Sequence, residues 1–257
     1  MAREQLPVKA KLLYGVGDVG NAIVNSAIQF FLLAFYTDAA LIAAGLAGTA
    51  LWVAKLWDAV NDPLFGWMSD RTTSRFGKRR VYMIFGALPL AISIALLWFV
   101  PQGLSEVGVF AWIVITFVLF DTAWTLTNVP YYALTAELTD DYDERASLTA
   151  YRMVLGVPAY VIGAALTPAF VGLFVLKSTG YGLMGVLYGI LAAAALLISA
   201  AGIRERKQIS ESKAKTPPLR AFAATFRNRP FVRLIVAYLL ANVAFALIRT
   251  LLYYFLT

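Results

Sequence analysis

Two aspartates four positions apart, Asp58 and Asp62, stand in an apolar part of the sequence, with Asn61 between them and Lys55 one helical turn ahead. Residues at i and i+4 share a helix face, so the two carboxylates converge. Both cannot stay ionised in an apolar setting without a counter-charge. Either one of them binds a proton, or a cation lies between them, or Lys55 neutralises one. Carboxylate and amide oxygens suit hard cations. A permanent pair with Lys55 would instead make the cluster structural.

Two further stripes of polar residues follow helical spacing. Ionisable residues inside membrane-spanning helices are costly and usually mark a pathway or a site, although Asn, Gln and Thr also bridge helices. Three stripes in one bundle predict a shared polar cavity, with interhelical bridging as the alternative. The two additional stripes are Asp18, Asn21, Asn25 and Gln29, and Asp121, Thr125, Asn128 and Tyr132.

The composition excludes whole classes of protein. Of the 257 residues, 60% are hydrophobic and 14% are charged, against about 25% charged in soluble domains, which excludes a water-soluble enzyme. The sequence has no Cys and no His, so thiol nucleophiles, histidine bases and metal sites built from these ligands are excluded.

Seven apolar stretches approach or exceed the roughly 20 residues that a spanning helix needs. No stretch alternates with period two, so we expect an all-α polytopic membrane protein. Pro63 removes one backbone hydrogen bond and is expected to bend or break the second helix beside the carboxylates. The stretches are 12–36, 43–66, 81–100, 107–130, 150–175, 181–203 and 230–257.

Lys and Arg gather in alternate loops, whereas the other loops hold only Lys177. The positive-inside rule therefore predicts a cytoplasmic N-terminus. The net charge of +7 has this topological cause, and no nucleic-acid partner is expected. We expect a six-helix bundle over 1–203, a cytoplasmic linker over 204–229, and a seventh helix over 230–257 that begins a second, missing bundle of the same protein.

Several strings resemble those of the glycoside–pentoside–hexuronide:cation symporters of the major facilitator superfamily. The resemblance covers essentially the whole chain, as helices one to seven of twelve. It implies alternating access between two six-helix bundles in a multi-pass protein, expected in the bacterial cytoplasmic membrane. The matching strings are Tyr14–Asp18, Tyr36–Asp38, Trp57–Pro63, Gly66–Arg71, Arg75–Arg80, Pro130–Leu134 and Asp143–Arg152.

The resemblance also implies site residues. A sodium, lithium or proton site falls on Asp58, Asn61, Asp62 and Thr125, with Asp58 and Asp62 as metal ligands if the ion is sodium. Arg152 helps to hold the sugar, and Tyr132 stands where an aromatic ring stacks on it. Two acids of the family are replaced by Ala22 and Asn128, while Asp18 and Asp121 lie one and two turns earlier. The expected substrate set is Asp18, Asn21, Asn25, Asp121, Asn128, Tyr132 and Arg152, and no cofactor besides the coupling ion is expected.

The loop over 66–80 resembles the cytoplasmic signature of the superfamily and is expected to act as a conformational latch. Gly66 would let helices approach closely, and Asp70 would cap a helix or pair with a basic residue. We expect the acidic run 137–144 to pair with Arg71, Arg75 or the basic linker. The expected latch residues are Gly66, Asp70, Arg71, Arg75, Gly77 and Lys78.

These features favour a cation-coupled symporter of a glycoside or related small polar solute. A sodium-coupled lysolipid carrier is the first alternative, because an animal carrier of that kind has a similar sequence pattern. A membrane prenyltransferase-type enzyme is the second, because such enzymes hold Mg²⁺ and a diphosphate on an Asp-x-x-x-Asp pair. A membrane scaffold would leave the three polar stripes unexplained.

Overall fold

The computed structural model describes residues 6–203, 205 and 228–256, with side chains up to residue 244. Contacts divide the chain into two units, Met1–Ile209 and Ser210–Thr257. The described part of the second unit is essentially one helix, α9 (Arg229–Leu256), over the stretch expected as the seventh span. The expected linker 204–229 lies outside the described residues except at Glu205, Asn228 and Arg229.

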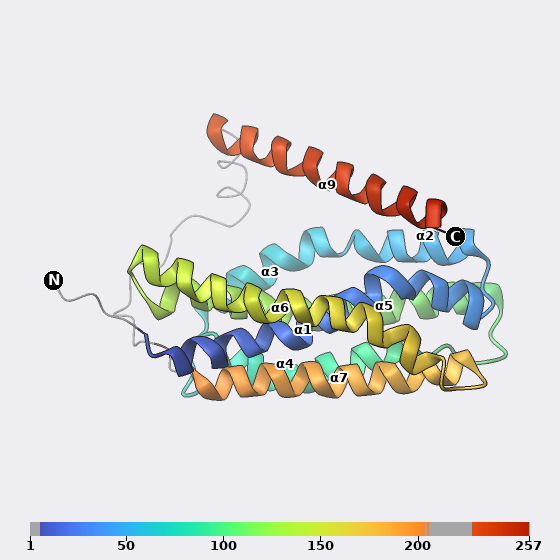
Figure 1. The fold of residues 1–257 in the computed structure, drawn as a ribbon, viewed down its shortest axis with the longest axis horizontal. Coiled ribbons are helices and arrows are strands. Elements are labelled where there is room, and N and C mark those ends of the chain that lie inside the picture. The colour runs from blue at the N-terminus through green and yellow to red at the C-terminus, as the bar shows by residue number, and fades with distance from the viewer. Residues whose placement is uncertain (1–5, 204, 206–227, 257) are drawn as a thin grey trace. The chain divides into compact units, whose positions relative to one another are not determined.

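The first unit is a bundle of long helices laid side by side (Figure 1). Five of its helical segments, with α1 and η1 taken as one, are long and apolar enough to span a membrane, which confirms the expected all-α membrane fold. The elements are α1 (Val8–Ala34), the π-helical η1 (Phe35–Ala39), α2 (Ala44–Lys55), α3 (Asp58–Arg71), α4 (Arg80–Leu97), α5 (Glu106–Leu138), α6 (Tyr142–Val171) and α7 (Lys177–Gly202).

The second predicted span, 43–66, is not one continuous helix. It breaks at Leu56 and Trp57, whose amides bond tightly to carbonyls three residues back, and α3 starts at Asp58. Pro63 lies inside α3 without ending it. A break was expected and is present, but its expected position was wrong, because the tight turn lies six and seven residues before the proline. Short turns of this kind inside a helix often mark hinges.

Small residues let the helices of the first unit approach closely. A Cβ atom on Gly20 of α1 would lie 2.6 Å from the Ala192 Cα atom of α7, and one on Gly189 of α7 would lie 2.5 Å from the Ala91 carbonyl oxygen of α4. Helix association in a bilayer depends on such close van der Waals contact. The bundle is therefore held through α7, which packs against both α1 and α4.

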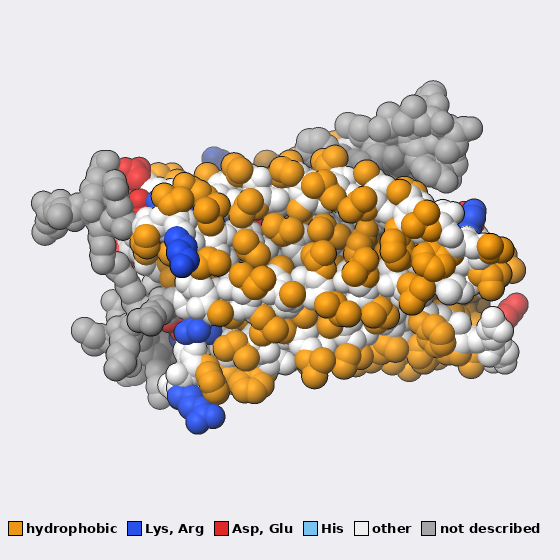
Figure 2. Space-filling model, turned by 60° about the horizontal axis from the view of Figure 1, so that its bottom comes forward, with side chains coloured by type: hydrophobic (Ala, Val, Ile, Leu, Met, Phe, Trp, Pro, Cys, Tyr) orange, Lys and Arg blue, Asp and Glu red, His pale blue; other side chains and the backbone are white. Residues whose placement is uncertain are grey.

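The outer flank of the bundle is apolar. Hydrophobic side chains cover the face drawn in Figure 2, and Lys and Arg side chains gather towards its ends. Phe85, Leu88 and Ile92 recur at steps of three and four along α4 and are all more than half exposed. An apolar surface of this kind is stable in contact with hydrocarbon and unfavourable in water. We therefore expect lipid to surround this flank of the bundle.

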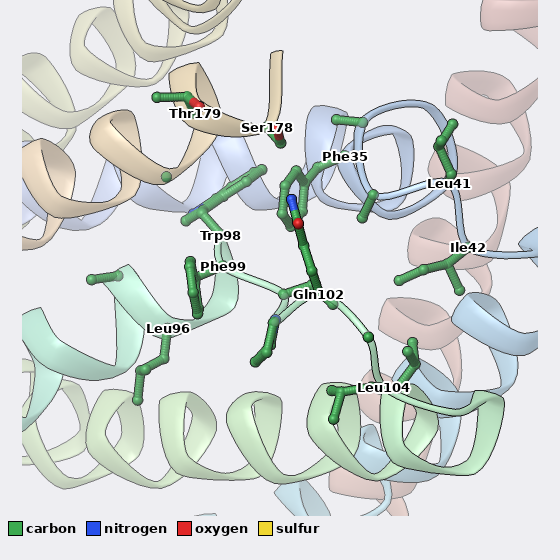
Figure 3. Close-up of a pocket in the computed structure, with 18 of the residues that line it drawn as sticks. Phe35, Leu41, Ile42, Leu96, Trp98, Phe99, Gln102, Leu104, Ser178 and Thr179 are labelled. Carbon is green, nitrogen blue, oxygen red and sulfur yellow. The ribbon is translucent and has the colours of Figure 1, made fainter. Parts of the chain in front are cut away.

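A cavity of about 1280 Å³ lies where η1, the α4–α5 loop and the start of α7 meet. Its walls are mainly apolar, and Gln102 extends from the loop towards Phe35 (Figure 3). Leu41 on its rim has a φ of 57°, a conformation that is uncommon for a residue with a side chain. None of the polar residues singled out from the sequence lines this cavity.

Gly189→Ala is expected to lower the free energy of unfolding by about 1–3 kcal/mol, because the added methyl group meets backbone atoms of α4 that have no room to move. The measurement is thermal unfolding of the full-length protein in detergent. Gly48→Ala is the matched control, since a Cβ there meets nothing within 4 Å. Equal unfolding temperatures for the two variants would contradict the close α4–α7 contact.

Candidate functional site

The break between α2 and α3 places Lys55 and Asp58 beside α5. The Trp57 indole donates a hydrogen bond of 2.9 Å to the Thr122 hydroxyl of α5 and so ties the break to that helix. The Lys55 Nζ atom lies 2.9 Å from Asp58 Oδ2 and 3.5 Å from Asp121 Oδ1. One ammonium group is thus shared by two carboxylates from two helices.

Asn61 joins the same group of residues. Its side-chain nitrogen donates to the Asp121 carbonyl oxygen at 3.0 Å and to Asp121 Oδ2 at 3.2 Å. Asn61 is fully buried, and within the described part of the chain its amide oxygen Oδ1 is the one buried side-chain polar atom without a hydrogen-bond partner. Asp121 was expected among the substrate residues, but its contacts place it with Lys55 and Asn61.

Asp62 is held differently. The Thr125 hydroxyl donates to Asp62 Oδ1 at 2.9 Å, and no ion pair to Asp62 forms among the residues that the structure describes. Over that same part of the chain, no three acidic side chains meet as ligands of one metal ion. Two groups of contacts lie together on α2, α3 and α5: one joins Lys55, Asp58, Asn61 and Asp121, and the other joins Asp62 and Thr125. We call these residues the cation cluster: Lys55, Asp58, Asn61, Asp62, Asp121 and Thr125.

A separate polar pocket of about 260 Å³ lies between α1, α5 and α6. At its centre the Arg152 guanidinium pairs with Asp18, with Nε to Oδ2 at 2.8 Å and Nη2 to Oδ1 at 3.4 Å. The same guanidinium lies 4.4 Å from the centre of the Tyr132 ring. Of the expected substrate set, Asp18, Asn21, Asn25, Tyr132 and Arg152 line this pocket, here named the polar pocket.

Asn128 lies just outside the polar pocket. It accepts a hydrogen bond from the Asn21 amide and donates one to the Trp124 carbonyl oxygen at 3.1 Å, so it supports a residue of the wall. Trp124 and Tyr160 also line the pocket and were missed. Trp124 lies one turn before Asn128 and two turns before Tyr132 on α5, so the helical spacing already used for that stripe could have indicated it.

The polar pocket can hold a polar solute by hydrogen bonding and stacking. Its carboxylate and guanidinium neutralise each other, its amides donate and accept, and its tyrosine and tryptophan rings offer flat apolar faces. Such a lining suits a solute that combines hydroxyl groups with an apolar face.

The loop over 66–80 forms a charge network centred on Arg79. Arg79 pairs with Asp70 at 2.5 Å and with Glu137 of α5 at 2.9 Å, and Lys78 lies 3.6 Å from Glu137. The basic linker, one of the three partners expected for the acidic run, lies almost wholly outside the described residues. Among the described residues the other two, Arg71 and Arg75, form no ion pair with that run. Their guanidinium groups stack instead on neighbouring rings, 4.2 Å from the centre of Trp67 and 4.8 Å from that of Phe76.

Two glycines of this loop differ in what they do. Gly77 has a φ of 106°, which favours glycine. Beside it, the Glu205 carboxylate accepts hydrogen bonds of 2.5, 2.8 and 2.6 Å from the backbone amides of Lys78, Arg79 and Arg80 at the start of α4, where a negative charge is stabilised. Gly66 does not bring helices together as expected, because a Cβ there meets only Val129, at 3.9 Å.

Comparison of the sequence with known proteins identifies the family to which the chain belongs. Residues 13–257 match the family described as MFS/sugar transport protein. An uncharacterized symporter of Synechocystis sp. is 36% identical over 80% of this chain and 39% of its own length. The sodium-dependent lysophosphatidylcholine symporter 1 of Gallus gallus is 30% identical over 96% of this chain and 53% of its own length.

A third relative, the putative glycoside/cation symporter YagG of Escherichia coli, is 38% identical over 59% of this chain and 33% of its own length. The chain thus spans about a third to a half of these relatives. The match extends over both described units and confirms the resemblance noted from the sequence. The chain belongs to the MFS/sugar transport protein family of the major facilitator superfamily.

Proposed function

We propose that the protein is a symporter that couples sodium or a proton to the uptake of a glycoside or related small polar solute by alternating access. The observation that carries the proposal is the Asn61 amide oxygen, which is buried without a partner. Leaving such an atom unpaired costs about 1–3 kcal/mol. A cation bound at Asp58, Asn61, Asp62 and Thr125 would use this oxygen as a ligand.

The charge balance of the cation cluster supports the same proposal. Three aspartates accompany a single lysine, and Asp62 has only the Thr125 hydroxyl as its partner among the described residues. An additional monovalent cation relieves this excess of negative charge, which gives the occupied and empty states different energies. Sodium and lithium suit oxygen ligands, and a carboxylate can bind a proton instead.

The solute would occupy the polar pocket. Its volume of about 260 Å³ is a little below the roughly 300–1,000 Å³ of ligand pockets that enclose a whole drug-sized molecule. The pocket would therefore hold part of the solute, with further contacts supplied by a second bundle of the same protein. Discontinuous helices and sites between two bundles are recurrent in transporters.

Helix α5 would connect the two sites. It contributes Thr125 and Asp121 to the cation cluster, while Trp124 and Tyr132 of the same helix line the polar pocket. A cation that pulls α3 and α5 together therefore acts on a wall of the pocket, and by linkage the solute acts equally on cation affinity. The coupling needs no contact between cation and solute.

Sodium-coupled lysolipid transport is the second candidate, favoured by the extent of the match to the lysophosphatidylcholine symporter, which covers 96% of this chain. The two candidates share the cation cluster and differ in the solute. The enzyme alternative is not retained, because the family is one of transport proteins.

We also propose that the protein lies in the bacterial cytoplasmic membrane with its N-terminus on the cytoplasmic side.

Asp62→Asn is expected to abolish cation-stimulated uptake, because the variant cannot present the carboxylate that Thr125 orients. The measurement is uptake into proteoliposomes that hold the full-length protein, with and without a sodium or proton gradient. Asp140→Asn is the control, since its side chain is 93% exposed and pairs only loosely with Arg145. Uptake by Asp62→Asn that still responds to either gradient would refute the assignment of the cation site.

Arg152→Lys is expected to weaken solute binding about tenfold or more, because a lysine cannot keep the two-point pair with Asp18 while facing Tyr132. Binding of glycosides, uronides and lysolipids is compared in the presence and absence of sodium. Glycoside binding that is lost in the variant supports the first candidate. Sodium-dependent binding of lysolipids alone selects the second.

The Arg79 network would act as the latch, with Asp70, Lys78 and Gly77 as members predicted from the sequence. Asp70→Lys is expected to change the accessibility of the polar pocket about two- to fivefold, as the loss of a partly exposed ion pair allows. The measurement is the labelling rate at Asn25→Cys, a pocket position, after subtraction of the rate of the same protein without this substitution. The 257 residues themselves contain no native cysteine. An unchanged rate, equal to that of an Asp140→Lys control, would refute the latch.

A further inference from the structure

We propose that Lys55 is a tethered competitor of the coupling cation and that Asp121 is the positioning residue that controls this competition. The inference rests on the cation site proposed above. It assigns roles to two residues beside that site, Lys55 at the end of α2 and Asp121 in the middle of α5, neither of which is proposed as a ligand of the cation.

The contacts of Lys55 show the competition. Its ammonium lies 2.9 Å from Asp58 Oδ2, so it already occupies one oxygen of a carboxylate that the cation needs. The same ammonium lies 3.5 Å from Asp121 Oδ1, the longer of its two contacts. Lys55 therefore sits between a carboxylate of the cation site and a carboxylate outside it, within reach of both.

Asp121 is the fixed partner and Lys55 the movable one. Only 4% of the Asp121 side chain is exposed, and Asn61 donates to both its carbonyl oxygen and Oδ2. The Lys55 side chain is 57% exposed, and the lysine ends α2 directly before the break at Leu56 and Trp57. A long side chain beside a tight turn can change partners without any helix being repacked.

A cation at Asp58 repels the ammonium towards Asp121, where it forms a neutral pair in a buried place. Without the Asp121 charge the ammonium has Asp58 as its remaining carboxylate, and the cation must displace it at a higher cost. Without the Lys55 charge nothing competes for Asp58. The two substitutions therefore change cation affinity in opposite directions, whereas a purely structural ion pair would lower stability in both variants and shift affinity in neither.

The test measures affinity of the purified full-length protein for sodium by calorimetry and for protons by a pH indicator. For the ion that the wild-type protein binds, Asp121→Asn is expected to bind about tenfold more weakly and Lys55→Gln about tenfold more tightly. The double variant is expected to bind within about threefold of Lys55→Gln, because removal of the lysine removes what Asp121 controls.

Asp121→Glu keeps the charge and is the matched control, expected within about threefold of wild type. If Lys55→Gln fails to fold, the difference between Asp121→Asn and Asp121→Glu still decides the question. Equal affinity of Asp121→Asn and wild type, or shifts in the same direction for both single variants, would overturn the inference. Asp62→Asn distinguishes failure of the proposed cation site from failure of the present inference. If this variant still binds the ion, the cation site itself is refuted. If it does not bind the ion, the affinities of the Lys55 and Asp121 variants test only the roles of these two residues.

Discussion

An ammonium group shared by two carboxylates is what holds the buried charge of Asp121 inside this bundle, beside Asp58, which is partly exposed, and Asp62, which is exposed. An unpaired carboxylate in such a place is strongly disfavoured, and Lys55 meets both Asp58 and Asp121. The lysine does not satisfy Asp62, which has a hydroxyl partner. The cluster is therefore held together and remains incompletely neutralised, and the proposed ion site would need both properties.

The separation of the two polar regions follows from the helices that carry them. α5 takes part in both, while α3 belongs to the cation cluster and α1 and α6 to the polar pocket. The Asp18–Arg152 pair makes the pocket electrically self-contained, so its charges do not draw on those of the cluster. In the proposed function, a solute and a cation would therefore not compete for the same acid.

The sequence allowed the helical fold, the polar stripes and most members of both regions to be predicted, because hydrophobic length and helical period are local properties. Asp18 and Arg152, two residues of the expected substrate set, both line the polar pocket. The period assigns a residue to a face but does not identify the helix opposite. Asp121 shares a stripe with Asn128 and Tyr132, yet it lies far enough along α5 to meet α3.

The other differences have the same origin. A bend or break of the second span was expected at Pro63, where a backbone hydrogen bond is lost. The helix instead breaks at Leu56 and Trp57, where the Trp57 indole donates a hydrogen bond to α5. Arg79 takes the acidic partners that were expected for Arg71 and Arg75, because it immediately precedes α4 and faces Glu137. In both cases the local sequence allowed more than one position for the break or more than one arginine for the ion pair. A contact with α5, which is distant in the sequence, determined which of them formed.

The division of the second span also bears on how the protein enters its membrane. Neither α2, with 12 residues, nor α3, with 14, reaches the length of roughly 20 residues that crosses the hydrocarbon core alone, and α3 carries charged groups that resist transfer into lipid. This segment would partition late in biogenesis, after neighbouring helices offer it polar partners. Its insertion efficiency would then depend on α5 being present, although α5 is synthesised afterwards.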